Sequence, residues 1–321
     1  METRREALYA RLKGRGMELA LPLATLAMIA FFATVSDVFL TGQNFRNIGI
    51  AAAGLAAVAF GQTFVILTAG LDLSVGSIVA LVSVVAAFVM REYGVGPGIV
   101  AALACGAAAG VVNGLVITRL RVSPFIATLA MLSVLAGLAL NLAGGVPILG
   151  LPTGFTLIAY QSVLGIPVPV IIAVVTLLVA EMMLRSTRFG RHLRAVGGNE
   201  EAARLSGIPV EKIRIAAYAI CGLTAAIGSI ILTARVASGQ PTLGATLPLE
   251  SIAAVVLGGV SLAGGRGSAL NVAVGVAFIS ILANGLNLLN ISSYTQMMII
   301  GAALIVAVAL DQANLKRAAG G

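Results

Sequence analysis

The chain has 321 residues, of which 59% are hydrophobic and only 10% are charged, and its mean hydropathy is +1.06. Soluble domains are about half apolar and about one quarter charged, so this composition excludes a soluble globular protein and predicts an all-α polytopic membrane protein. The net charge of +8 does not indicate a nucleic acid partner, because anionic lipids of the cytoplasmic leaflet attract the same charge.

Ten apolar stretches are predicted to cross the membrane as helices, because a bilayer core of about 30 Å requires about 20 apolar residues. The first, at about 17–36, follows a basic leader at 1–16 and is too long for the apolar region of a signal peptide. Residues 17–312 would form one transmembrane domain, and 313–321 a cytoplasmic tail. The other nine spans are predicted at 47–69, 75–90, 97–117, 124–143, 166–185, 214–234, 249–263, 268–289 and 294–311.

The distribution of Lys and Arg predicts the orientation of these spans, because short positively charged loops stay in the cytoplasm. With the N-terminus inside, all but three of the 20 Lys and Arg residues lie on the cytoplasmic side. The three outside are Arg46, Arg91 and Arg235. Ten spans with both termini cytoplasmic is therefore the predicted topology.

Two turns interrupt the hydrophobic pattern without adding much charge. The first, at 69–77, has two interpretations: either Asp72 and Ser74 cap the next helix, where an exposed carboxylate gains from the helix dipole, or the acid has a function within the membrane. The second, at 258–268, faces the same side and has a similar glycine and serine spacing, which suggests an internal duplication. The residues singled out in the first turn are Gly70, Asp72, Ser74 and Gly76.

The segment 197–214 is the only sizeable polar segment in the chain. Asn199 is a good N-cap, two acidic residues follow in the first turn, and Gly207 with Pro209 ends the helix. The predicted helix has about two turns, so it needs a supporting neighbour. It is either a solvated linker between two spans or a docking helix.

Enzymatic chemistry is not indicated. A P-loop requires a lysine followed by Ser or Thr, and none of the three lysines is so followed. His, Cys, Asp and Glu form no metal, cofactor or nucleophile–base constellation. Glu181 and Arg185, spaced i, i+4, predict an ion pair. A secondary transporter would carry acids or histidines in mid-span, whereas the acids here lie near span ends; composition does not exclude a facilitator channel.

Five segments are informative when they are taken together: Ile66-Leu67-Thr68-Ala69-Gly70-Leu71-Asp72-Leu73-Ser74-Val75-Gly76-Ser77, Gly197 to Ile208, Ile252 to Gly259, Ala283 to Leu289, and Ser292-Ser293-Tyr294. They resemble the ribose-type, or monosaccharide, branch of ABC importer permeases. The resemblance extends from about the second span to the end of the chain.

This resemblance implies a homodimer in the bacterial inner membrane, an ATPase subunit with two nucleotide-binding modules on the cytoplasmic face, and a periplasmic or extracellular sugar-binding protein. ATP hydrolysis would then occur in the partner. The substrate implied is ribose, with another pentose, a hexose or a furanose-like molecule as the alternative. The Glu-Ala-Ala pattern implies that the loop 187–213 couples to the ATPase through Asn199, Glu200, Glu201, Ala202, Ala203, Arg204 and Gly207.

Amide side chains within the spans are candidates for a sugar path, because amides donate to and accept from hydroxyl groups. The alternative is that each amide bonds between helices and has a structural role. Tryptophan is absent and aromatic residues make up 5% of the chain, so a tight stacking site for a sugar ring is not predicted. The candidates are Gln62, Asn113, Asn284 and Asn287.

Overall fold

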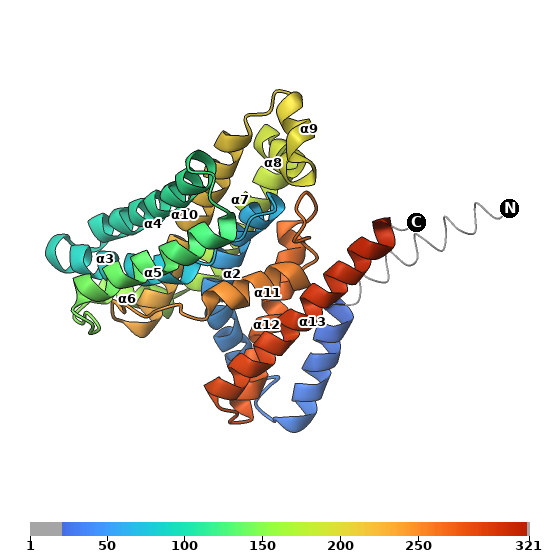
Figure 1. The fold of residues 1–321 in the computed structure, drawn as a ribbon. Coiled ribbons are helices and arrows are strands. Elements are labelled where there is room, and N and C mark those ends of the chain that lie inside the picture. The colour runs from blue at the N-terminus through green and yellow to red at the C-terminus, as the bar shows by residue number, and fades with distance from the viewer. Residues whose placement is uncertain (1–20, 320–321) are drawn as a thin grey trace.

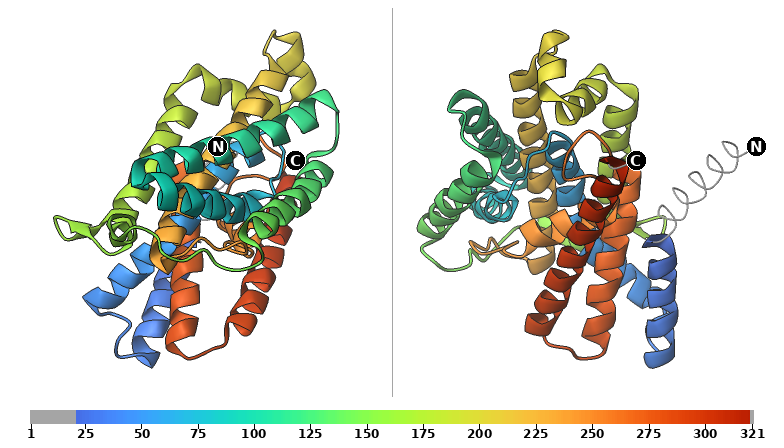
Figure 2. Two further views of the ribbon diagram at one scale, coloured as in Figure 1. Left: turned by 90° about the vertical axis from the view of Figure 1, so that its left-hand side faces the viewer. Right: turned by 45° about the vertical axis from the view of Figure 1, so that its right-hand side comes forward.

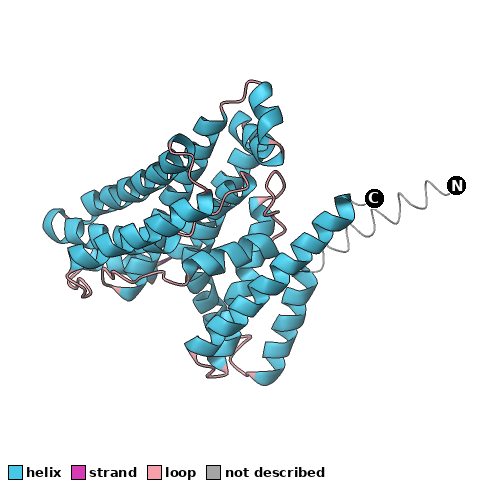
Figure 3. Cartoon of the chain, in the orientation of Figure 1, coloured by secondary structure: helices cyan, strands magenta, loops and turns pink. Residues whose placement is uncertain are grey.

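The computed structural model describes residues 21–319, and most of these are helical (Figures 1 and 3). The basic leader lies outside the described residues. One short hairpin, β1 Ser162–Val163 with β2 Ile166–Pro167, is antiparallel and lies in the connection before α7. The same connection holds α6 (Thr153–Thr156) and a 3₁₀ turn, η1 (Leu157–Ala159).

Seven described helices are long and apolar enough to cross a membrane. Each coincides with one of the predicted spans, which confirms an all-α polytopic membrane protein. They are α2 Gly42–Leu67, α3 Val75–Tyr93, α4 Val95–Arg119, α5 Pro124–Ala143, α7 Val168–Ser186, α10 Val210–Val236 and α12 Ala269–Leu288.

The three remaining predicted spans also contain apolar helices: Leu21–Val35, α11 (Leu247–Leu257) and the apolar part of α13 (Ser293–Ala319). With 11 residues, α11 is about 17 Å long, so it is shorter than a bilayer core. Gly258 forms its C-cap and Gly259 has a φ of +79°. The helix therefore ends at Leu257, and the glycine-rich turn begins before the predicted end of this span at residue 263.

The centre of the bundle is formed by α2, α3 and α10. In the most apolar part of α2, 83% of the residues are buried, whereas the share is 22% in α5, which lies at the periphery. Small residues let α4 and α10 approach closely: a Cβ atom at Gly110 would overlap the carbonyl oxygen of Tyr218, and one at Gly222 would overlap that of Gly106.

Loops far apart in the sequence meet at the two ends of the bundle. At one end the backbone N–H of Gly265 donates to O of Leu67, the last residue of α2, at 3.0 Å. A Cβ atom at Gly264 would lie 2.9 Å from the nitrogen of Ala69, so the two glycine-rich turns contact each other on one side, as predicted. At the other end Arg46 donates to Tyr160 O at 2.8 Å, and the Tyr160 hydroxyl to Arg235 O at 3.0 Å. Figure 2 shows α9 projecting at the first end and the turn between α12 and α13 at the opposite one.

Candidate functional site

The polar segment between α7 and α10 contains two helices, α8 (Arg188–Gly198) and α9 (Glu200–Leu205), which project from one end of the molecule (Figure 1). The Asn199 side chain accepts a hydrogen bond from the N–H of Ala202 at 2.9 Å, and Gly207 has a φ of +77°. The predicted N-cap and the predicted glycine stop are therefore confirmed.

The helix α8 was not predicted, because residues 187–213 were interpreted as a loop with a single short helix. Its apolar side chains, however, recur at helical spacing: Leu193 and Val196 are buried, and Phe189 packs against the core. Thr187 caps the helix by accepting from the N–H of Gly190 at 3.1 Å. This periodicity was the signal for an amphipathic helix lying on the end of the bundle.

The two acidic residues at the start of α9 have different environments. Glu200 receives hydrogen bonds from Arg214 at 2.6 and 3.1 Å and from Arg204 at 3.3 Å, so it joins α9 to the beginning of α10. Glu201 is exposed, as is Ala202, while Ala203 is buried. Leu205, which the sequence analysis did not single out, exposes 81% of its surface. The outer face of α9 is thus formed by Glu201, Ala202 and Leu205.

The turn after α2 places Asp72 in the interior of the bundle, where it is fully buried. One carboxylate oxygen accepts from the backbone N–H of Ser74 at 2.9 Å and from its hydroxyl at 2.6 Å. The carboxylate therefore bonds Ser74, the residue just before α3, but neither side chain accepts from an N–H of the helix itself. The predicted cap and the expected solvent exposure are both wrong. Burial raises the pKa of Asp72, and hydrogen bonds from Ser74 and Asn113 oppose that rise.

Two of the predicted amides meet at Asp72, one at its carboxylate and the other at its backbone carbonyl group. Asn113 on α4 donates to the Ser74 hydroxyl at 2.7 Å and to Asp72 Oδ2 at 3.3 Å. Gln62 on α2 donates to the carbonyl oxygen of Asp72 at 3.2 Å. Among the described residues, Asn113 Oδ1 is the buried side-chain oxygen without a hydrogen-bond partner. We call Gln62, Asp72, Ser74 and Asn113 the Asp72 cluster.

Residues of α5 and α10 complete the surroundings of the Asp72 cluster and were not predicted. The hydroxyl groups of Thr128 and Tyr218 each donate to Leu71 O at 3.3 Å. The Cys221 thiol donates to Gln62 Oε1 at 3.4 Å. Tyr218 and Cys221 are spaced i, i+3 on α10, which places both polar groups on one helix face.

The other two amides lie elsewhere. Asn284 on α12 and Asn44 on α2 exchange two hydrogen bonds of 3.0 Å, which fits the alternative of an interhelical contact. Asn287 is exposed. The four amide candidates therefore do not line one common path. Gln62 and Asn113 belong to the Asp72 cluster, and Asn284 and Asn287 lie outside it.

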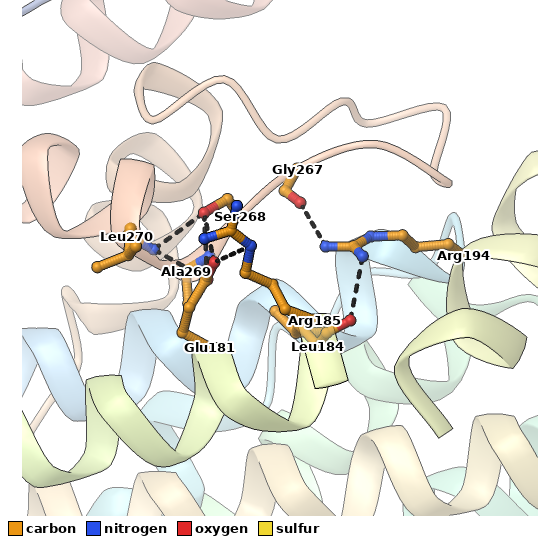
Figure 4. Close-up of polar contacts among 8 residues, drawn as sticks. All are labelled: Glu181, Leu184, Arg185, Arg194, Gly267, Ser268, Ala269 and Leu270. Carbon is orange, nitrogen blue, oxygen red and sulfur yellow. Dashed lines mark hydrogen bonds and ion pairs between the residues drawn. The ribbon is translucent and has the colours of Figure 1, made fainter. Parts of the chain in front are cut away.

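The predicted ion pair between Glu181 and Arg185 is present, with 3.4 Å between Arg185 Nε and Glu181 Oε1. The carboxylate has a second role that sequence spacing did not reveal. It accepts from the N–H groups of Ala269 at 2.9 Å and Leu270 at 3.3 Å (Figure 4), and so caps the first turn of α12. A pocket of about 560 Å³ adjoins this contact, lined by Glu181, Arg185, Arg194, Ser268, Leu270 and Asn271.

The structure is thus a bundle of helices long enough to cross a membrane, with the polar helix pair α8 and α9 at one end. Residues 44–308 match the family described as the permease component of the branched-chain amino acid transport system. The chain belongs to this family of permeases, and it is a multi-pass protein of the bacterial inner membrane. No solved structure matches it.

Curated relatives cover nearly the whole chain. The ribose import permease protein RbsC of Escherichia coli (strain K12) is 45% identical over 297 residues, which are 90% of this chain and 92% of the relative. RbsC of Bacillus subtilis (strain 168) is 44% identical over 294 residues, covering 90% and 91%. The L-arabinose transport system permease protein AraH of Escherichia coli (strain K12) is 37% identical over 286 residues, covering 87% and 85%.

Proposed function

We propose that the chain is the membrane-spanning subunit of an ATP-driven ABC importer for ribose. The observation that carries this proposal is the 45% identity to the ribose import permease RbsC over 90% of the chain. The relative named for L-arabinose is 37% identical, and one named for D-allose is 34% identical, so ribose has the strongest support. Another monosaccharide of the same class is the alternative.

The choice of sugar is tested by competition. The permease is expressed with its own ATPase and binding protein in cells that lack a ribose permease, and uptake of labelled ribose is measured. A tenfold excess of unlabelled ribose should suppress uptake of the label, whereas the same excess of L-arabinose or D-allose should leave it nearly unchanged. Suppression by arabinose or allose as strong as that by ribose would contradict the assignment.

The topology proposed with this function has ten membrane segments and both termini in the cytoplasm. The meeting of loops at two separate ends supports it: the polar segment and both glycine-rich turns lie at one end, and Arg46 and Arg235 at the other. Cysteines introduced at Leu164 and Ser206 test the sides. A membrane-impermeant thiol reagent should label L164C in intact cells and S206C only after permeabilisation; the reverse pattern would exclude this topology.

The docking surface proposed for the ATPase is the outer face of α9. Two observations support this surface. An N-cap and an ion pair to α10 fix the position of α9, and the side chains on its outer face, including Leu205, are exposed. The binding protein would dock at the opposite end, near Arg46, Arg91 and Arg235, and a second copy of the chain would complete the membrane unit. Within the bundle, Gln62 and Asn113 are the amides proposed to lie nearest the sugar path.

A further inference from the structure

The docking helix is joined to the interior of the bundle through α8. Asn199 is the only residue between α8 and α9, and it serves both helices. Its backbone N–H donates to Ala195 O at 3.0 Å, and its side chain caps α9. With one shared capping residue and no further linker, α8 and α9 are joined end to end.

The C-terminal end of α8 rests against the two glycine-rich turns. A Cβ atom at Gly197 would overlap Leu67 O and lie 2.7 Å from the nitrogen of Gly265, and these are the two atoms whose hydrogen bond joins the end of α2 to the second turn. A Cβ atom at Gly264 would lie 2.8 Å from Gly197 O. The backbones are therefore in direct contact, and no side chain separates α8 from the turns.

One turn before this contact, Arg194 bridges two further segments. Its guanidinium donates to Leu184 O of α7 at 3.0 Å and to Gly267 O at 3.1 Å (Figure 4). Gly267 lies two residues before α12 and has a φ of +153°. This part of the loop therefore lies outside any helix or strand, and hydrogen bonds such as that from Arg194 hold it in place. On its other side, Glu181 caps α12 through Ala269 and Leu270.

We propose that Arg194 is a positioning residue for coupling: it makes the segment 265–268, and with it the start of α12, follow α8 when the ATPase moves α9. The planar guanidinium suits this role because it can hold two carbonyl groups in different directions at once, which a lysine ammonium on a flexible stem does less rigidly. Glu181 then transmits the same movement between α7 and α12. This inference rests on the proposed function of α9.

The test measures sugar molecules transported per ATP hydrolysed in vesicles that contain the permease, its ATPase and its binding protein. We expect Arg194→Gln to retain ATP hydrolysis stimulated by the binding protein. The ratio should fall about fivefold or more, because coupling between two sites typically changes affinity by a factor of about 5 to 150. Arg194→Lys should lie between this variant and the wild type. Arg188→Gln, which removes an exposed arginine of the same helix, is the matched control and should keep the wild-type ratio.

A purely structural role of Arg194 gives a different result. It would reduce the amount of folded complex, so transport and hydrolysis would fall together and their ratio would stay at the wild-type value, which would overturn the proposal. An unchanged ratio with normal expression would overturn it equally. Failure of the proposed function is recognised separately, because wild-type vesicles would then transport no sugar in response to ATP.

Discussion

Replacing Gly207 with valine is expected to lower ATP-driven transport by about tenfold while the permease remains in the membrane. Gly207 has a φ of +77° and no atom lies within 4 Å of the position a Cβ would occupy. The substitution therefore meets no steric obstacle from neighbours, and its cost comes from the backbone alone. A left-handed conformation costs an L-residue about 1–2 kcal/mol, which corresponds to about a tenfold loss of the native end of α9.

Gly207→Asn is the matched control for this prediction. Asparagine adopts left-handed backbone more readily than other side-chain-bearing residues, and the open space around Gly207 accommodates it. The N–H of Gly207 bonds Arg204 O, and that of Ile208 bonds Ala203 O, both at 3.0 Å, and the asparagine variant should keep them. Transport is measured against permease content of the membranes. Wild-type transport by the valine variant would exclude a coupling role for this turn.

Replacing Asp72 with alanine should have the largest effect on stability. The substitution removes the acceptor for the Ser74 N–H and hydroxyl and for the Asn113 amide, all in the buried interior. A buried donor without a partner costs about 1–3 kcal/mol, so the loss of several should lower the melting temperature by many degrees and abolish transport. The measurement is thermal unfolding of the purified protein in detergent, monitored by size-exclusion chromatography.

Asp72→Asn separates hydrogen bonding from charge. Its amide oxygen can still accept from Ser74 at the same site, whereas the side chain can no longer carry a negative charge. If Asp72 holds the turn by accepting hydrogen bonds, the asparagine variant should retain most of the stability and transport that the alanine variant loses. If the negative charge itself were required for transport, the asparagine variant would be folded but inactive, and the structural account of this residue would be wrong.

The sequence predicted features whose causes are local. Apolar length located the seven long helices, because crossing a bilayer requires a continuous apolar segment. Asn199 and Gly207 predicted the two ends of α9, because capping and a left-handed backbone conformation depend on the type of the residue at that position. Similarly, the spacing of Glu181 and Arg185 predicted their ion pair.

Features that depend on distant contacts were not predictable in this way. The cap that Glu181 provides to α12 joins residues 88 positions apart in the chain, and no spacing rule indicates it. The burial of Asp72 follows from the packing of α4 and α10 around the turn. The short length of α11 reflects the glycine-rich turn that contacts α2 and α8, whereas hydropathy alone extended that span by several residues.

The central claim is that ATP hydrolysis by a partner drives sugar import through this chain. Its most direct test is uptake of labelled ribose into vesicles that hold the permease and the ATPase, with the binding protein on the substrate side. Accumulation should require ATP and all three proteins, should stop with vanadate, and should fall sharply in the Gly207→Val variant. Uptake that is indifferent to ATP, or that follows an ion gradient, would contradict the claim and assign the chain to the secondary transporters.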